Sequence, residues 1–205
     1  VGVCDSTTQA VVDEVRAHGV SVVASTGNDG LTNITKPANC SGVLAVTAHT
    51  RDGNRATYAN VGDATSLSAP GGDQTYAVAS TWNDGLTTPG NNVYGYLHGT
   101  SMAVPQVVGT LALMASVRPD LPMQSLETLL LQSTRAFPVG SYCARNVGMC
   151  GAGLLDAGAA VAAAQAYEVP DAGGGCTVAP KGQADAGLPL LALVAAISLF
   201  WRRRR

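Results

Sequence analysis

The chain has 205 residues, of which 13% are charged, 5% are aromatic and 24 are glycine. This composition excludes a charge-rich disordered chain and a coiled coil, and it fits one loop-rich α/β domain with a tail. Four of the twelve basic residues are Arg202 to Arg205 at the end of the chain. The rest of the chain has 8 basic and 14 acidic residues, which is a net charge of −6. Because these basic residues form no stripe, we expect no nucleic-acid partner.

The first predicted elements are a helix and two short strands. No signal peptide precedes residues 1–5, which resemble the end of an element, so we expect the C-terminal part of a longer protein. Residues 6–18 are predicted to form an amphipathic helix, capped by Ser6 with Gln9 and ended by Gly19. Two short strands are predicted next, at 20–25 and 42–48. Both are nearly continuous apolar runs, which are typical of a parallel sheet covered on both faces.

The middle of the chain is rich in turn residues and ends in a helical pattern. Between residues 50 and 97 we expect several short strands, including 56–60 and 77–81. Helical spacing begins at Thr100 and continues to about Val117. Two more helices are predicted, one after Pro122 and one over 155–167.

The last segments differ in composition from the rest. Residues 169–187 are rich in Gly, Ala and Pro, which predicts a linker. Residues 188–201 contain one polar residue, Ser198, so a helix there has no polar face and membrane insertion is favoured over an amphipathic or buried C-terminal helix. Fourteen residues span roughly 21 Å, which suffices for a short transmembrane helix if neighbouring residues and snorkelling arginines contribute. The terminal arginines then stay cytoplasmic and the domain lies outside.

The five cysteines point to an oxidising compartment rather than to a metal site. They form no CxxC pair and do not cluster with the three histidines, so no zinc site is expected. Cys143 and Cys150 share one Gly-rich loop and are candidates for a disulfide, and Cys4 with Cys40 is a candidate second pair. The alternative is five free thiols.

Two short stretches carry candidate chemistry. Ser101, in HGTSMAVPQ, is predicted at the start of a helix, where unpaired N–H groups and the helix dipole favour developing negative charge. Asn28, in STGNDG, follows a buried strand at the sheet edge where open α/β sheets bind ligands. Each stretch alone is also explained by ordinary capping or turn chemistry.

Five segments in order resemble the subtilisin-like serine proteases. They are VVASTGNDG (22–30), PANC with GVLAV (37–46), SAPG (68–71), GTSMAVP (99–105) and GAGLLDA (151–157), within a segment taken as 1–168. The cysteine placement is similar to that of secreted bacterial members. The resemblance implies an α/β, three-layer fold with a mostly parallel sheet flanked by helices, and a secreted endopeptidase acting on proteins or peptides.

The resemblance also implies roles for particular residues. Ser101 would be the nucleophile, and Asn28 would donate to the oxyanion together with the Ser101 backbone N–H. Residues 25–27 (Ser25, Thr26 and Gly27), with Gly99 and Thr100, would line the substrate pocket. No cofactor is implied for the chemistry, although the family leaves room for structural calcium that no ligand spacing here assigns.

The general base is not expected in this chain. His18, His49 and His98 lie outside the family's histidine motif, and the chain order in subtilisins is Asp, His, Ser. We therefore expect Asp and His upstream of Val1, and no activity from this chain alone. Gln106 replaces a histidine that is usual in the family, which keeps open an inactive, membrane-tethered binding module.

The tail has a resemblance of its own. GGGC (173–176), an apolar segment and terminal arginines resemble the C-terminal sorting signals of Gram-negative secreted proteins. This implies recognition by a membrane sorting protease, with modification near Cys176, and export to the surface or medium with an inner-membrane anchor at 188–205. A plain membrane anchor is the alternative.

Overall fold

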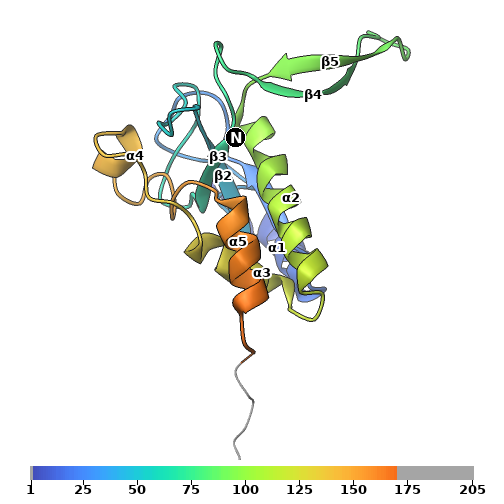
Figure 1. Ribbon diagram of the computed structural model, residues 1–205. Coiled ribbons are helices and arrows are strands. Elements are labelled where there is room, and N and C mark those ends of the chain that lie inside the picture. Colours follow the sequence, from blue (N-terminus) through green and yellow to red (C-terminus); the bar gives the residue numbers. More distant parts are fainter. Residues whose placement is uncertain (1, 170–205) are drawn as a thin grey trace, which may run out of the picture. The chain divides into compact units, whose positions relative to one another are not determined.

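The computed structural model describes residues 2–169 (Figure 1), and residues 2–167 lie in one compact unit. The predicted linker, membrane segment and Cys176 lie at residues 170–205, outside the described residues. The helices are α1 (Ser6–Ala17), α2 (Thr100–Val117), α3 (Met123–Gln132), α4 (Tyr142–Arg145) and α5 (Ala157–Ala166), and the strands are β1 (Val22–Ser25), β2 (Val43–His49), β3 (Leu67–Pro70), β4 (Val78–Asn83) and β5 (Asn92–Leu97).

Three parallel strands form the centre of the domain. Their order is β1-β2-β3, with Val22 paired to Val43 and Val46 paired to Leu67. Every residue of β2 is buried, as expected for the middle strand of a parallel sheet. Alternate side chains face α2 and α1, so helices cover both faces (Figure 1). The predicted α/β fold with a parallel sheet is confirmed.

Helix α2 is the main core helix of the described chain. It contains no charged residue, and its buried side chains recur at intervals of three and four: Thr100, Ala103, Val107, Thr110, Leu111 and Met114. Among residues 2–169 only this helix is long and apolar enough to cross a membrane. It packs against β2, β3 and α5, so we assign it to the core of the domain. Outside this buried stripe, Val108, Leu113 and Val117 are exposed.

The start of α1 differs from the sequence prediction. The N-cap is Asp5, not Ser6, because the Asp5 carboxylate accepts hydrogen bonds from the backbone N–H and the hydroxyl of Thr8 at 2.8 and 3.0 Å. Lys36 forms an ion pair with the same carboxylate. The hydrogen bonds and the ion pair hold the pKa of Asp5 well below its usual range.

Both predicted disulfides are present. Cys4–Cys40 joins the segment before α1 to the loop before β2, and Cys143–Cys150 closes the loop that contains α4. The first disulfide lies at the small core cluster between α1 and the sheet, where Val12 contacts Val43. Because disulfides form and persist in oxidising compartments, these two bonds indicate that the folded domain is found in one.

A largely buried ion pair joins α1 to α3. The Arg16 guanidinium donates to both oxygens of the Glu127 carboxylate, at 3.0 and 2.9 Å, and 9% of the Glu127 side chain is exposed. The Gln124 side chain donates to the Arg16 carbonyl at 3.2 Å, which adds a second contact between the two helices.

Removing one partner of this pair is expected to destabilise the domain strongly. Arg16→Met leaves the Glu127 carboxylate buried without its partner, so we expect about 3 kcal/mol less free energy of unfolding. Arg16→Met with Glu127→Leu is expected to recover most of that loss, because no charge is then left buried. Urea unfolding of the two variants and the wild type measures both values. A double variant as unstable as the single one contradicts this account.

Two other predictions about the middle of the chain need correction. Residues 56–60 are not a strand: the Ala59 N–H donates to the Ala56 carbonyl in a turn, and Asn60 bonds to the loop after β1. The strand predicted at 77–81 is present as β4, and its partner β5 was not predicted. Together they form a two-stranded antiparallel hairpin that projects from the body of the domain (Figure 1).

Candidate active site

Ser101 lies in the first turn of α2 with its side chain exposed. The N-cap is Gly99, with φ of +153°, a conformation that L side chains rarely adopt. A Cβ atom at Gly99 would lie 3.4 Å from the Asn28 side-chain nitrogen and 3.7 Å from the Met102 sulfur. The space would accept a Cβ atom at ordinary contact distance, so the positive φ is what favours glycine at this turn into the helix.

Asn28 is held at the start of the same helix by Thr100. The Asn28 Oδ1 atom accepts hydrogen bonds from the Thr100 backbone N–H at 2.9 Å and from the Thr100 hydroxyl at 2.8 Å. Because the oxygen is held from two directions, the amide plane is fixed and Nδ2 is left on the side of Gly99. The structure thus brings together the two sequence-predicted catalytic segments.

Two hydrogen-bond donors at this point remain available. Within residues 2–169, neither the Ser101 backbone N–H nor the Asn28 Nδ2 group donates to a protein acceptor. The Ser101 N–H also belongs to the first turn of α2, where the helix dipole favours negative charge. Such a pair of unpaired donors beside a serine hydroxyl can stabilise the oxyanion formed when a carbonyl is attacked.

Asn60 fixes the loop that carries Asn28, a role that the sequence prediction missed. Its side-chain oxygen accepts from the backbone N–H groups of Asp29 and Leu31 at 3.0 and 2.9 Å, and its backbone N–H donates to the Gly27 carbonyl. A Cβ atom at Gly27 would lie 2.5 Å from the Asn60 Nδ2 atom, and φ at Gly27 is +104°. Only glycine fits this contact, which is why the turn contains one.

The remaining sequence-predicted pocket residues divide into two groups. Ser25 and Gly27 are half-buried at the end of β1 and in the loop after it. Thr26 and Thr100 are buried, and their hydroxyl groups bond to the Asn60 carbonyl and to Asn28. Burial favours a supporting role for these two threonines over direct contact with a substrate.

The segment after β3 connects the site to the sheet. The Gly99 N–H donates to the Gly71 carbonyl at 3.0 Å, and the Tyr58 hydroxyl donates to the same carbonyl and to that of Gly72. Burial raises the pKa of Tyr58 to about 12, so this hydroxyl remains a donor at physiological pH. The Tyr58 ring also contacts the His98 ring, with centroids 5.3 Å apart.

None of the three histidines forms a base–nucleophile pair with Ser101 in the part of the chain that the structure describes. His18 caps the end of α1, and His98 contacts Tyr58. His49 lies one residue beyond the strand predicted at 42–48, but it is the last residue of β2. It is 7% exposed, and its Nδ1 atom lies 2.9 Å from the Thr50 carbonyl oxygen.

Burial of His49 predicts lower stability in acid. Desolvation, with a smaller contribution from Arg135, lowers the pKa of His49, against opposing effects of the Thr50 hydrogen bond and Asp52. As pH falls through the ordinary histidine value of about 6.5, the unfolded chain therefore binds a proton that the folded chain does not. Stability should fall from pH 8 towards pH 5, and less steeply in His49→Gln.

Urea unfolding at a series of pH values measures this slope. His18→Gln, at an exposed histidine, is the matched control and should keep the wild-type slope. An unchanged slope in His49→Gln would show that other groups cause the acid sensitivity.

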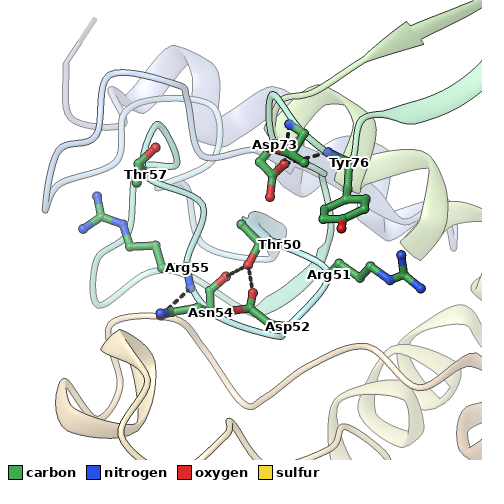
Figure 2. A pocket seen from close by; sticks show the side chains of 9 residues that line it. Thr50, Arg51, Asp52, Asn54, Arg55, Thr57, Asp73 and Tyr76 are labelled. Carbon is green, nitrogen blue, oxygen red and sulfur yellow. Dashed lines mark hydrogen bonds between the residues drawn. The ribbon is translucent and has the colours of Figure 1, made fainter.

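A separate hollow of about 660 Å³ is lined by polar and charged residues (Figure 2). Its charged groups are engaged by their neighbours: Asp52 accepts from the Thr50 hydroxyl, and Asp73 accepts from two backbone N–H groups. The Arg51 guanidinium lies 5.1 Å from the centre of the Tyr76 ring. The residues that line this hollow include no serine or histidine, so we do not place the catalytic chemistry there.

The structure does not assign a metal site. Across residues 2–169, no group of three or more His, Cys, Asp or Glu side chains is placed to hold a metal ion. Calcium also takes backbone carbonyls and waters, so the structural calcium implied by the resemblance stays a prediction without named ligands.

Comparison with known proteins agrees with this geometry. The family model described as the subtilase family matches residues 2–167. An extracellular protease of Xanthomonas campestris pv. campestris is 43% identical over 166 residues, and subtilisin BL of Lederbergia lenta is 33% identical over 155 residues. The solved structure of a protease from Pseudoalteromonas arctica PAMC 21717 has 42% identity and a TM-score of 0.71. The chain belongs to the subtilase family.

The chain covers only part of each relative. The matches include 80% of this chain and 27% of the Xanthomonas protein, and 76% of this chain and 51% of subtilisin BL. The match to the Pseudoalteromonas structure covers 80% of this chain and 48% of that chain. About half or more of each of these relatives has no counterpart here.

Proposed function

We propose that this chain supplies the nucleophile and the oxyanion site of a secreted serine endopeptidase. The Ser101 hydroxyl attacks the peptide carbonyl, and its proton passes to a histidine base. Asn28 Nδ2 and the Ser101 N–H stabilise the resulting oxyanion. The amine leaves with that proton, and water then hydrolyses the acyl-enzyme. The observation that carries the proposal is the pair of unpaired donors beside Ser101, held by the Asn28–Thr100 hydrogen bonds.

The Asp and His of the triad come from residues outside Val1–Arg205 in this proposal. Two features of the described residues support further elements that would pack against this domain. Strand β1 lies at the edge of the sheet and its residues are only half-buried, whereas β2 is fully buried. Val108, Leu113 and Val117 of α2 are exposed apolar side chains as well. Both are expected where further strands and helices of a larger domain would pack.

Labelling with a fluorophosphonate tests the proposal. This reagent reacts with a serine that is activated by a base, so the full-length protein is expected to be labelled and residues 1–205 alone are not. Circular dichroism of both samples establishes that they are folded. A folded full-length protein that stays unlabelled would refute the proposed peptidase activity.

Gln106 favours one alternative, an inactive binding module tethered to the membrane. It is exposed on α2, in the hollow that also contains Met102 and Pro105. Its side chain can both donate and accept hydrogen bonds, as the usual histidine can, which is compatible with an active enzyme. The sequence upstream of Val1 separates the alternatives, because an inactive module would lack the Asp or the His.

Export is the third part of the proposal. The two disulfides and the extracellular relative from Xanthomonas support an oxidising destination. We infer that the tail inserts in the inner membrane through residues 188–201 and is cut near Cys176 by a membrane sorting protease. Mass spectrometry of the protein in the medium tests this, since an intact tail there contradicts cleavage.

A further inference from the structure

The β4–β5 hairpin exposes an aromatic surface next to the candidate active site. Trp82, Tyr94 and Tyr96 account for three of the ten aromatic residues of the chain, and they are 53%, 78% and 70% exposed. Tyr94 pairs with Thr81 and Tyr96 pairs with Ala79, so the two tyrosines lie on one face of the ribbon, and Trp82, which pairs with Val93, lies on the other face. Such a concentration of exposed aromatic side chains is typical of a binding surface.

The edges of this hairpin have none of the usual protection against pairing with another chain. Exposed edge strands usually carry charges, proline or bulges. Here the six residue pairs are in unbroken register, and neither strand contains a charged residue or a proline. The one charged residue in the hairpin, Asp84, lies in the tip, where its carboxylate bonds to the backbone and side chain of Asn91.

The hairpin is also ordered without a partner. The Asn83 side-chain oxygen accepts from the backbone N–H groups of Gly85 and Gly90 at 3.0 and 2.7 Å, which closes the tip. The Trp82 side chain packs over Gly95, where a Cβ atom would lie 3.1 Å from it. The ribbon therefore presents its uncharged face in a defined shape, which lowers the entropic cost of binding.

The hairpin leads directly into the candidate active site, which favours a polypeptide substrate as its occupant. Strand β5 ends at Leu97. Gly99 and Thr100 follow it, and their backbone N–H groups bond to Gly71 and Asn28 in the candidate active site. Tyr94 is seven residues from Ser101, a reach of roughly 23 Å along an extended chain. A substrate bound at Ser101 that extends about seven residues beyond the scissile bond is therefore long enough to reach Tyr94.

We propose that the Tyr94–Tyr96 face of the hairpin is an exosite for an extended, uncharged segment of a polypeptide substrate, away from the bond that is cut. The inference rests on the proposed peptidase function for its occupant. Aromatic contacts supply the affinity, and the open strand edges allow main-chain pairing that depends little on sequence. The exosite thus favours long, unfolded polypeptides over short peptides.

Kinetics with a long and a short substrate test the exosite. In the full-length protein, Tyr94→Ala with Tyr96→Ala is expected to lower kcat/KM for β-casein about tenfold, mainly by raising KM. Hydrolysis of a chromogenic tetrapeptide should change less than twofold, since an extended tetrapeptide spans only about 13 Å. Thr81→Lys, which places a charge opposite Tyr94 without truncating an aromatic ring, should act in the same direction. The matched control truncates two exposed valines elsewhere, Val139→Ala with Val147→Ala, and should match wild type.

Binding to a protein without the nucleophile separates the exosite from the peptidase function. In full-length Ser101→Ala, β-casein binding should persist and should weaken about tenfold when both tyrosines are removed. If the protein is not a peptidase, the difference in β-casein binding is still expected. If the double tyrosine variant hydrolyses β-casein like the wild type, the exosite proposal is wrong but the peptidase proposal is not affected. An equal loss on the tetrapeptide overturns the exosite. So does a dimer in sedimentation that the tyrosine variant abolishes, because a second copy is then the occupant.

Discussion

Ser101→Ala is expected to lower peptide hydrolysis by the full-length protein by about 10⁶-fold, the effect of losing the nucleophile in a subtilisin, which belongs to the same family. The side chain is exposed at the start of α2 and makes no contact that the fold needs, so the variant should fold normally. Turnover of a chromogenic peptide measures the loss, and circular dichroism checks the fold.

Ser116→Ala is the matched control for this prediction. Ser116 is an exposed serine on the same helix, and its hydroxyl bonds only to the Leu113 carbonyl. It should retain full activity and full fluorophosphonate labelling. Substantial hydrolysis by folded Ser101→Ala would instead mean that another residue is the nucleophile.

Asn28→Leu is expected to lower kcat by about 10²- to 10³-fold with little change in KM. This magnitude is the one measured for the corresponding oxyanion donor in a subtilisin, a member of the same family, so it is carried over. The physical reason is that Nδ2 contributes only when negative charge develops on the substrate oxygen. Steady-state kinetics on the full-length protein separates the two constants.

Thr100→Val tests how much the position of the Asn28 side chain matters, as distinct from the hydrogen bond that Asn28 donates to the oxyanion. The valine keeps the backbone N–H bond to Asn28 but loses the hydroxyl bond of 2.8 Å, so Asn28 is held by one contact instead of two. We expect a loss of at most about tenfold in kcat, the value of one ordinary hydrogen bond. An Asn28→Leu enzyme with wild-type kcat would exclude Asn28 from the oxyanion site.

The elements that the sequence predicted well are those whose burial is continuous. Strand β2 is buried throughout and helix α2 buries side chains at intervals of three and four, and both patterns are visible in the sequence. Residues 56–60 were misassigned because Ala56 and Ala59 are fully buried in a turn, which produces the same apolar signal as a strand. Strand β5 was missed because its six residues are mostly exposed and carry no alternation against a core.

The candidate site was predictable in part for the same reason. Ser101 and Asn28 lie in motifs that resemble a family, so their roles could be inferred before any geometry was known. The contributions of Asn60 and Thr100 depend on bonds between segments that are far apart in sequence. An asparagine after a turn-like segment carries no local signal that it will hold a loop thirty residues earlier, so only the structure could identify it.

The hydrogen bond between Asn28 and Thr100 joins residues 72 positions apart in the chain. Contacts of such long range are expected to form late in folding, because bringing the two residues together costs chain entropy. That cost is offset only once the intervening strands and hairpin have folded. Asn28 therefore cannot be aligned with Ser101 in a partly folded molecule. A chain in which residues 29–99 have not yet folded would therefore lack the two donors of Asn28 and Ser101 side by side.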